Sequence, residues 1–265
     1  MARFGQFLSL DSPKAIKARK KGYLNGINYM APASTGGVGN LCPHASAGCL
    51  ALCLGWYSGQ AGIVPAGQDG VGNNAARKSR VAKAQMFMND RAAFMREMFA
   101  GIRRAERKAH REGLKLCVRL NGATDIAYEG VRFNESTREM GSLASGKTVF
   151  ETFPHIQFVD YTKSVRRALA HANHMLPPNY HLTFSRSETN ESDCIRVLDA
   201  GGNVAVVFAG ELPEFYLGSR VIDGDETDLR HLDPGPGASG LGVVIGLSPK
   251  GNKAKRDNSG FVVRL

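Results

Sequence analysis

The feature that most constrains the fold is a series of short apolar runs that alternate with helical stretches in the second half of the chain. Four of these runs are predicted to be buried strands: 114–120, 156–162, 180–185 and 203–208. Helical patterns separate several of them, at 163–175 and 191–202, and two further short strands are expected near 219–222 and 243–247. Buried strands that alternate with helices are typical of βαβ units in a parallel sheet. The pattern predicts an α/β fold with about six strands, a partial or distorted parallel (βα) barrel.

The N-terminal part of the chain has a different character. Residues 1–75 are rich in Gly, Ala, Ser and Pro, and 31–40 and 59–74 are predicted to be loops. A short helix between those loops would place Cys49 and Cys53 four residues apart on one helix face. Apolar residues at helical spacing predict a helical region over 75–112, broken near Asn89 and Asp90. We therefore expect one domain over 1–265, with a loop-rich segment (1–75) and a barrel-like body (76–265).

The cysteines are unevenly distributed. Three of the five, Cys42, Cys49 and Cys53, lie within the stretch "NLCPHASAGCLALCLG". The sequence has no apolar run of transmembrane length and no secretion signal, which predicts a cytoplasmic protein without membrane contact. Thiols stay reduced in the cytoplasm, and an odd number of cysteines argues against a complete set of disulfides. Three clustered thiols in a reducing compartment predict a site for a soft metal.

Two kinds of metal site remain open. A structural zinc needs four ligands, and His44 would complete a Cys₃His set with the three cysteines. Alternatively, three cysteines can hold three irons of a [4Fe–4S] cluster and leave the fourth iron open to substrate, solvent or another ligand, with Cys194 a candidate for that position. The glycines around the cysteines would let the backbone pass close to a bulky iron–sulfur cluster. We expect Cys42, Cys49 and Cys53 to hold an iron–sulfur cluster, most plausibly [4Fe–4S], with zinc as the alternative.

Polar residues follow the predicted strands where each one ends. Because the carboxyl ends of parallel strands share one edge, these side chains are expected to line a single cavity. The candidates for binding a substrate or an anion there are Arg119, Asn121, Asp125, Lys163, Arg186 and Glu188. Lys250, at the end of a later strand, is expected to face the same cavity as Arg119. The sequence identifies no catalytic residue.

The chain is basic: Lys and Arg number 34 against 24 Asp and Glu, a formal net charge of +10. The positive charge is concentrated in three segments, 12–21, 77–111 and the C-terminal tail. If these segments meet on one face, they can follow a phosphate backbone. Nucleic acid and an anionic small molecule are therefore the predicted partners.

An acidic segment, "DGDETDLRHLDP" at 223–234, interrupts this positive charge. Clustered carboxylates can bind Mg²⁺ and support phosphoryl chemistry in a nuclease. We favour an acidic loop whose Asp residues cap turns and pair with Arg230.

Blocks of sequence along most of the chain resemble a bacteriophage family known as gene product eighty-eight. The blocks that carry the resemblance are "NYMAPASTGGVGNLCPHASAGCLALCLG", "ARKSRVAKAQMFMND", "VRLNGATDIAYE", "VDYTKS", "LTFSRSE", "NVAVVF" and "VIDGDETDLRHLDP…VVIGLSPKG". The resemblance implies a phage-encoded protein in the cytoplasm of an infected bacterium, and it supports the three cysteines as a unit. In outline, three cysteines before an α/β half-barrel are also similar to radical S-adenosylmethionine enzymes, although the Cys-x3-Cys-x2-Cys motif of those enzymes is absent.

The combined expectation is a phage iron–sulfur protein, and two functions fit it. In the first, an open site on the iron–sulfur cluster serves a redox or radical-type enzyme. In the second, a structural zinc or iron–sulfur site supports a nucleic-acid-binding protein.

Overall fold

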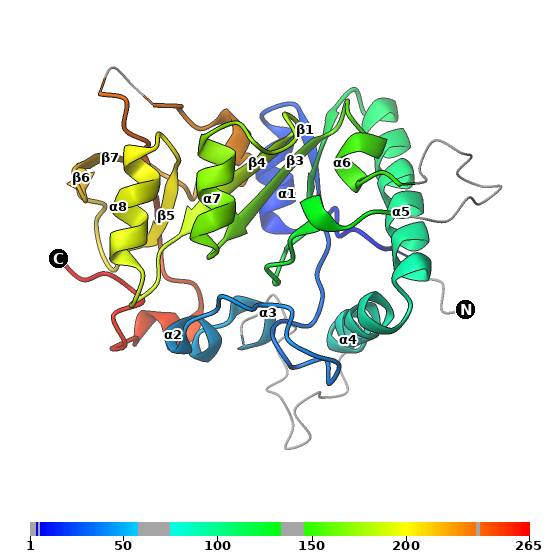
Figure 1. The fold of residues 1–265 in the computed structure, drawn as a ribbon, viewed down its shortest axis with the longest axis horizontal. Helices are drawn as coiled ribbons and strands as arrows, with labels where there is room; N and C mark the ends of the chain where they lie inside the picture. Colours follow the sequence, from blue (N-terminus) through cyan, green and yellow to red (C-terminus); the bar gives the residue numbers. More distant parts are fainter. Residues whose placement is uncertain (1–3, 5, 58–74, 134–145, 237–238) are drawn as a thin grey trace.

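Most of the strands of the protein belong to one sheet. The computed structural model describes residues 4, 6–57, 75–133, 146–236 and 239–265, and in these residues eight strands pair in the order β1-β2-β3-β4-β5-β8-β7-β6 (Figure 1). The strands are β1 (Tyr23–Ile27), β2 (Lys115–Arg119), β3 (Gln157–Thr162), β4 (Tyr180–Ser185), β5 (Val204–Val207), β6 (Phe215–Tyr216), β7 (Ser219–Asp223) and β8 (Val244–Leu247). Each neighbouring pair is parallel except the β6–β7 hairpin.

The first five strands are added in chain order, so each crossover steps in the same direction. Right-handed crossovers of this kind put their helices on one face of a sheet. Figure 1 shows that face covered by α5 (Arg91–Arg111), α6 (Val149–Thr152), α7 (Val165–Ala172) and α8 (Glu191–Asp199). A seven-residue helix, α1 (Pro13–Arg19), lies on the opposite face.

The core follows from the alternation of side chains along the buried strands. In β2, Leu116 and Val118 pack into the main hydrophobic core together with Phe99 of α5. Cys117 lies between them in sequence and points to the other face, where it packs with Ala18 of α1. Both faces of these strands are therefore apolar, which explains why they read as continuous hydrophobic runs.

The remaining elements are short and gather mainly near the carboxyl ends of the strands. They are α2 (Ala47–Ala51), α3 (Leu54–Tyr57), α9 (Gly251–Lys255) and two 3₁₀ helices, η2 (Tyr128–Gly130) and η4 (Arg230–Leu232). The longer α4 (Ala75–Asn89) lies beside α3 in Figure 1 and leads into α5. Asp90 separates α4 from α5 and accepts a hydrogen bond from the Ala93 amide at 2.9 Å, which confirms the predicted break in this helical region.

The α/β class and the mostly parallel sheet are confirmed, and all six predicted strands are present. The barrel is not confirmed. The pairing order is linear, because β8 lies between β5 and β7 and the β6–β7 hairpin forms one end of the sheet. The sequence pattern also missed β1, whose short apolar run lies in the glycine-rich N-terminal segment. The predicted loop at 59–74 falls almost entirely outside the described residues.

Candidate functional site

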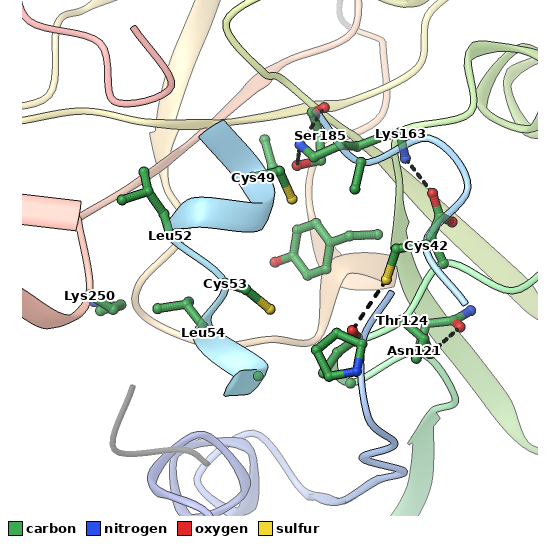
Figure 2. A pocket seen from close by; sticks show the side chains of 18 of the residues that line it. Cys42, Cys49, Leu52, Cys53, Leu54, Asn121, Thr124, Lys163, Ser185 and Lys250 are labelled. Carbon is green, nitrogen blue, oxygen red and sulfur yellow. Dashed lines mark hydrogen bonds between the residues drawn. The ribbon is translucent and has the colours of Figure 1, made fainter. Parts of the chain in front are cut away.

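A cavity of about 270 Å³ lies at the carboxyl edge of the sheet, where β2, β3, β4, β5 and β8 end. All three clustered cysteines line it, Cys42 and Cys53 from loops and Cys49 from α2. Figure 2 shows their sulfur atoms pointing into the same space from different sides. All of the cysteines of the chain are free thiols in the structure. The cavity therefore offers three sulfur donors to whatever occupies it.

Each cysteine is positioned by its own backbone environment. The Sγ of Cys42 accepts a hydrogen bond from the Ala33 amide at 3.2 Å. Cys49 is the middle residue of α2, and its amide donates to the side chain of the N-cap residue Ser46 at 3.2 Å. Cys53 follows the end of α2, which stops at Ala51. The expectation that Cys49 and Cys53 share one helix face is therefore wrong, because the helix is too short to include both.

Glycines allow the cysteine-bearing turn to pack tightly on the sheet. A Cβ on Gly55 would lie 2.3 Å from the Cβ of Ala123, in the loop that follows β2. A Cβ on Gly122 would lie 2.6 Å from the carbonyl oxygen of Asn28. Both distances are well inside van der Waals contact, so these two positions require glycine if the chain is to approach this closely.

Helix α2 is tied to the sheet by Glu188, in the loop after β4. The Glu188 carboxylate accepts hydrogen bonds from the Gly48 amide and the Ser46 hydroxyl, both at 2.8 Å. Partial burial raises the pKa of Glu188. The hydrogen bonds together lower the pKa by more than burial raises it, so the net shift is downward. Glu188, predicted to bind substrate, instead holds the helix that carries Cys49.

Burial keeps the three thiols protonated when nothing is bound. It raises the pKa of Cys42 to about 12 and that of Cys53 to about 11, and it raises the pKa of Cys49 as well. The cysteines also raise one another's pKa, since several thiolates in one cavity would repel. Thiolates would therefore form at this position only if nearby positive charge offset the effect of burial.

Helix α4 sends basic side chains inward beside the cavity. Arg77 donates to the carbonyl of Trp56 at 2.7 Å, and Arg80 donates to the carbonyl of Gly55 at 2.8 Å. Lys83, one turn further on, is buried as well, and burial lowers its pKa to about 8. The sequence analysis counted this segment with the positive charge that can follow a phosphate backbone, but these three side chains are buried. One feature hinted at this burial: α4 contains no acidic residue to pair with its cations.

Among the described residues, neither metal hypothesis finds a complete set of ligands already in place. Within the described residues, no three His, Cys, Asp or Glu side chains are close enough to hold a single metal ion. His44, the proposed fourth zinc ligand, is not among the residues that line the cavity. Cys194 is buried in a separate hydrophobic core on α8 and does not line it either.

Arg119 is the predicted anion-binding residue that best fits a ligand role. It lines the cavity, its Nε donates to the carbonyl of Asn121 at 3.3 Å, and its Nη1 lies 3.4 Å from Asp228. Its guanidinium lies over the ring of Tyr161. Within the described part of the chain, Nη2 of Arg119 has no hydrogen-bond partner, so the side chain retains donors for a bound anion.

Asn121 also lines the cavity, but its amide is fully used inside the protein. Its nitrogen donates to Asp160 and to the carbonyl of Ile126, both at 3.0 Å. Its oxygen accepts from the Thr124 hydroxyl at 2.8 Å and the Ile126 amide at 2.9 Å. Asn121 therefore shapes the loop after β2 and has little capacity left for a substrate.

Asp125 and Lys163 join neighbouring strand ends. Asp125 accepts from the Lys163 amide at 2.9 Å and from Arg167 at 2.6 Å. The Lys163 ammonium donates to the carbonyl and hydroxyl oxygens of Ser185 and to the carbonyl of Arg186, at 2.9 to 3.2 Å. Both residues line the cavity. Their hydrogen bonds are largely made within the protein. They therefore contribute charge to the cavity, but few free hydrogen-bonding groups.

Arg186, like Glu188, does not line the cavity. Its Nη1 donates to the carbonyls of Gly260 and Phe261, at 2.8 and 3.2 Å. It thereby holds the C-terminal segment, from which Phe261 closes one side of the cavity.

In the acidic segment 223–234, one aspartate pairs with Arg230 as favoured, but Asp225 and Asp228 line the cavity. Asp225 pairs with Lys250 at 2.9 Å, and Asp233 pairs with Arg230 at 3.2 Å. Lys250 lines the same cavity as Arg119, as expected.

Sequence reasoning missed Arg167 of α7 as a structural anchor of the site. Only 6% of its side chain is exposed, and it forms ion pairs with Asp125 and Glu129, both at 2.6 Å. It also donates to the hydroxyl of Tyr180 at 2.9 Å. In the sequence Arg167 stands beside Arg166 in a basic helix, and nothing there separates the buried arginine from the exposed one.

The fold and the cavity define a class: an α/β protein with an open, mostly parallel sheet and three free cysteines gathered at its carboxyl edge. The chain belongs to the Gene product 88 family, whose family model matches residues 7–265. This confirms the phage family predicted from the sequence blocks. A search of curated proteins and a search of solved structures give no match, so the likeness to radical S-adenosylmethionine half-barrels has no support from a relative.

None of the helices in the described residues combines the length and the apolar character needed to cross a membrane.

Proposed function

We propose that the cavity holds an iron–sulfur cluster on Cys42, Cys49 and Cys53, and that the protein is a redox or radical-type enzyme acting on a small anionic molecule. A [4Fe–4S] cluster suits this donor set, since three thiolates leave one iron without a protein ligand. Such a cluster supplies one-electron chemistry or an open Lewis-acidic iron when bound. The residues of the chain bind the iron–sulfur cluster, exclude water and orient the substrate.

The observation that carries the proposal is the convergence of the three thiols. They come from three separate backbone positions between residues 42 and 53, yet all three line one cavity. Buried apolar thiols scattered in a core would have no reason to converge at the edge where α/β proteins build their sites. Cys117, which lies within β2 and packs with Val159 and Leu229, illustrates the ordinary buried alternative.

In the part of the chain that the structure describes, a single zinc ion lacks a fourth ligand, because neither His44 nor Cys194 lines the cavity. A structural zinc is held by four ligands at about 2.0 to 2.3 Å, so its ligands lie close together. The described residues contain no such group. A cubane of four irons and four sulfides is larger and is bound by thiolates that stand further apart around it.

The charges around the cavity support a negatively charged occupant. Arg80 lies close enough to Cys53 for its charge to lower the pKa of that thiol, against the larger effect of burial. Lys163 acts in the same direction on Cys49. Three thiolates on an iron–sulfur core carry a net negative charge, and these buried cations would stabilise it in a low-dielectric environment.

The substrate side of the cavity is the region around Arg119. Arg119, Tyr161 and Lys250 line it, with Leu247 and Val207 as apolar neighbours. A mostly apolar cavity with a few convergent polar groups is typical of small-molecule sites. The free donors of Arg119 suit a carboxylate or a phosphate.

The test is anaerobic purification followed by an absorption spectrum and iron, sulfide and zinc analysis of the same sample. We expect a brown protein with about four irons and four sulfides per chain, the stoichiometry of a [4Fe–4S] cluster. Cys42→Ala, Cys49→Ala and Cys53→Ala should each lose most of the iron.

Cys194→Ala is the matched control, because Cys194 is buried outside the cavity. It should retain the iron and the spectrum. A colourless protein with one zinc per chain would overturn the proposal, as would equal loss of iron in all four variants.

A further inference from the structure

We propose that a basic surface at the amino edge of the sheet, opposite the cavity, binds the phosphate backbone of a nucleic acid. The amino edge is the edge at which the parallel strands begin. This interaction is separate from the proposed chemistry of the cavity and does not depend on it.

Two of the three basic segments of the sequence meet at this edge. Helix α1 ends at Arg19 and α5 ends at Arg111, and an ion pair between Arg19 and Glu112 joins the two helix ends. The start of β2 is attached to the same place, since the Lys115 amide donates to the carbonyl of Gly22 at 2.9 Å.

Five exposed cations lie on these joined elements, and we call them the basic edge. They are Lys20, Arg104, Arg107, Arg111 and Lys115. Three of them lie on α5 at spacings of three and four residues, which places them on one side of that helix. Within the described residues, none of the five forms an ion pair.

The acidic residues near the basic edge have local partners. Glu112 pairs with Arg19 and lies 4.0 Å from Lys108. Glu106 contacts His155 at 2.5 Å, and Glu226 pairs with Lys21 at 2.7 Å. The carboxylates of this region therefore have local partners, and the five cations of the basic edge remain available to an external anion.

Helix-end electrostatics does not account for the whole surface. Cations in the last turn of a helix stabilise its dipole, which explains Arg111. Arg104 and Arg107 lie one to two turns before the end of α5, where that effect has faded. Lys115 is in a strand. A row of unpaired cations that extends beyond the helix end fits a repeating anion such as a phosphate backbone.

The basic residues of α4 and of the C-terminal segment do not reach this edge. The basic residues of α4 that the structure buries, Arg77, Arg80 and Lys83, turn toward the cavity side. The C-terminal segment is held beside the cavity by Arg186. Of the three basic segments, only the first and the α5 part of the second therefore share this edge.

The test measures binding of a fluorescent, random-sequence DNA duplex by anisotropy over a series of salt concentrations. We expect the logarithm of affinity to fall steeply with the logarithm of salt, as phosphate contacts require. Neutralising the basic edge, with Lys20, Arg104, Arg107, Arg111 and Lys115 each changed to Gln, should weaken binding at least tenfold at low salt. The salt slope should fall by up to about 4.5, at roughly 0.9 for each lost phosphate contact.

A matched control removes the same amount of charge elsewhere. Lys78, Arg220, Lys253, Lys255 and Arg256 are also exposed, and changing these five to Gln lowers the net charge equally. Circular dichroism and thermal unfolding establish that both variants are folded. The control should keep most of the affinity and of the salt slope.

Three results would overturn the proposal. The first is no salt-dependent DNA binding by the wild-type protein, and the second is an equal loss of DNA affinity in the two five-residue variants. The third is that changing the basic edge weakens binding to phosphatidylserine vesicles but not to DNA. Because the iron analysis uses the cysteine variants and this test uses the basic edge, either proposal can fail without the other.

Discussion

At the scale of single residues, burial keeps three histidines neutral at a pH where they would take up a proton in water. Burial lowers the pKa of His171 and His231 to about 4 and that of His181 to about 3. The rings of His171 and His181 lie 4.6 Å apart, so their charges would also repel. These histidines are neutral in the folded protein even in mildly acidic solution.

The pH dependence of stability follows from this. Below a pH of about 6.5 the unfolded chain takes up a proton at His181, whereas the folded chain does not. Stability from this group is therefore complete above the unfolded pKa and is lost as the pH falls toward the folded one. We predict that the unfolding free energy of the wild-type protein falls between pH 7 and pH 5 by about 2 kcal/mol more than that of the His181→Gln variant.

Urea unfolding of wild type and variant at the two pH values measures this difference. The comparison cancels the contribution of Asp160, whose pKa burial raises to about 6. His110→Gln is the control, because His110 is exposed on α5. An unchanged pH dependence in His181→Gln would contradict the prediction.

Residue identity predicted which side chains gather at the site. It predicted less well what each side chain does there. Five of the six strand-end candidates line the cavity or hold the helix that lines it. Among the candidates that line the cavity in the described part of the chain, Arg119 keeps a donor without a partner, because Asn121 and Lys163 spend theirs on neighbouring groups. A sequence shows that a residue is polar, but the partners that satisfy it come from loops far away in the chain.

At the scale of elements, the site depends on how firmly the short helix α2 is attached. A helix of five residues is not stable by itself. Glu188 supplies the attachment, and Gly48 allows it, since a Cβ there would lie 2.7 Å from the carboxylate. The position of Cys49 is therefore set by a residue that is distant in sequence.

We predict that Glu188→Gln destabilises the protein by about 1–2 kcal/mol, because it replaces two charge-assisted hydrogen bonds by weaker ones. It should also speed the loss of iron to a chelator. Glu191→Gln is the control: Glu191 is half exposed, and its ion pair with Arg186 spans 3.6 Å. Urea unfolding and the rate of iron release measure both effects, and equal behaviour of the two variants would contradict the assignment.

The elements themselves show which sequence patterns are informative. Strongly apolar strands and the α4–α5 break were predicted because each is specified by local residues. Strand β1 and the shortness of α2 were not, because both lie in a glycine-rich region where tertiary contacts decide the structure.

At the scale of the whole molecule, the cavity is enclosed mainly by short elements on one side of a large sheet. Short helices with few buried residues have low local stability, and binding to them raises their protection. We predict that iron–sulfur loading slows amide hydrogen exchange in α2 and α3 and in the loop after β2. Exchange in β3 and β4 should change little.

Hydrogen-exchange mass spectrometry of the loaded protein and the Cys49→Ala variant measures this pattern. A uniform change over the sheet would indicate global stabilisation instead, and it would contradict a site confined to the carboxyl edge.

The open sheet and its strand order were the least predictable features at this scale. The local pattern predicts parallel strands, and it gives the same prediction for an open sheet and for a barrel. Here β8 pairs with both β5 and β7. The position of β8 depends on which strands it pairs with. Those strands are separate segments of the chain, so no short stretch of sequence specifies the pairing.

The strand order also has a consequence for how the protein is made on the ribosome. Strands β1 to β5 can join the growing sheet in the order in which they are synthesised. The cavity cannot form in that way, because its wall includes Tyr29 near the beginning and Phe261 near the end. A nascent chain exposes its three cysteines early and encloses them last, so the cavity that would hold the proposed metal centre closes only after translation has passed Phe261.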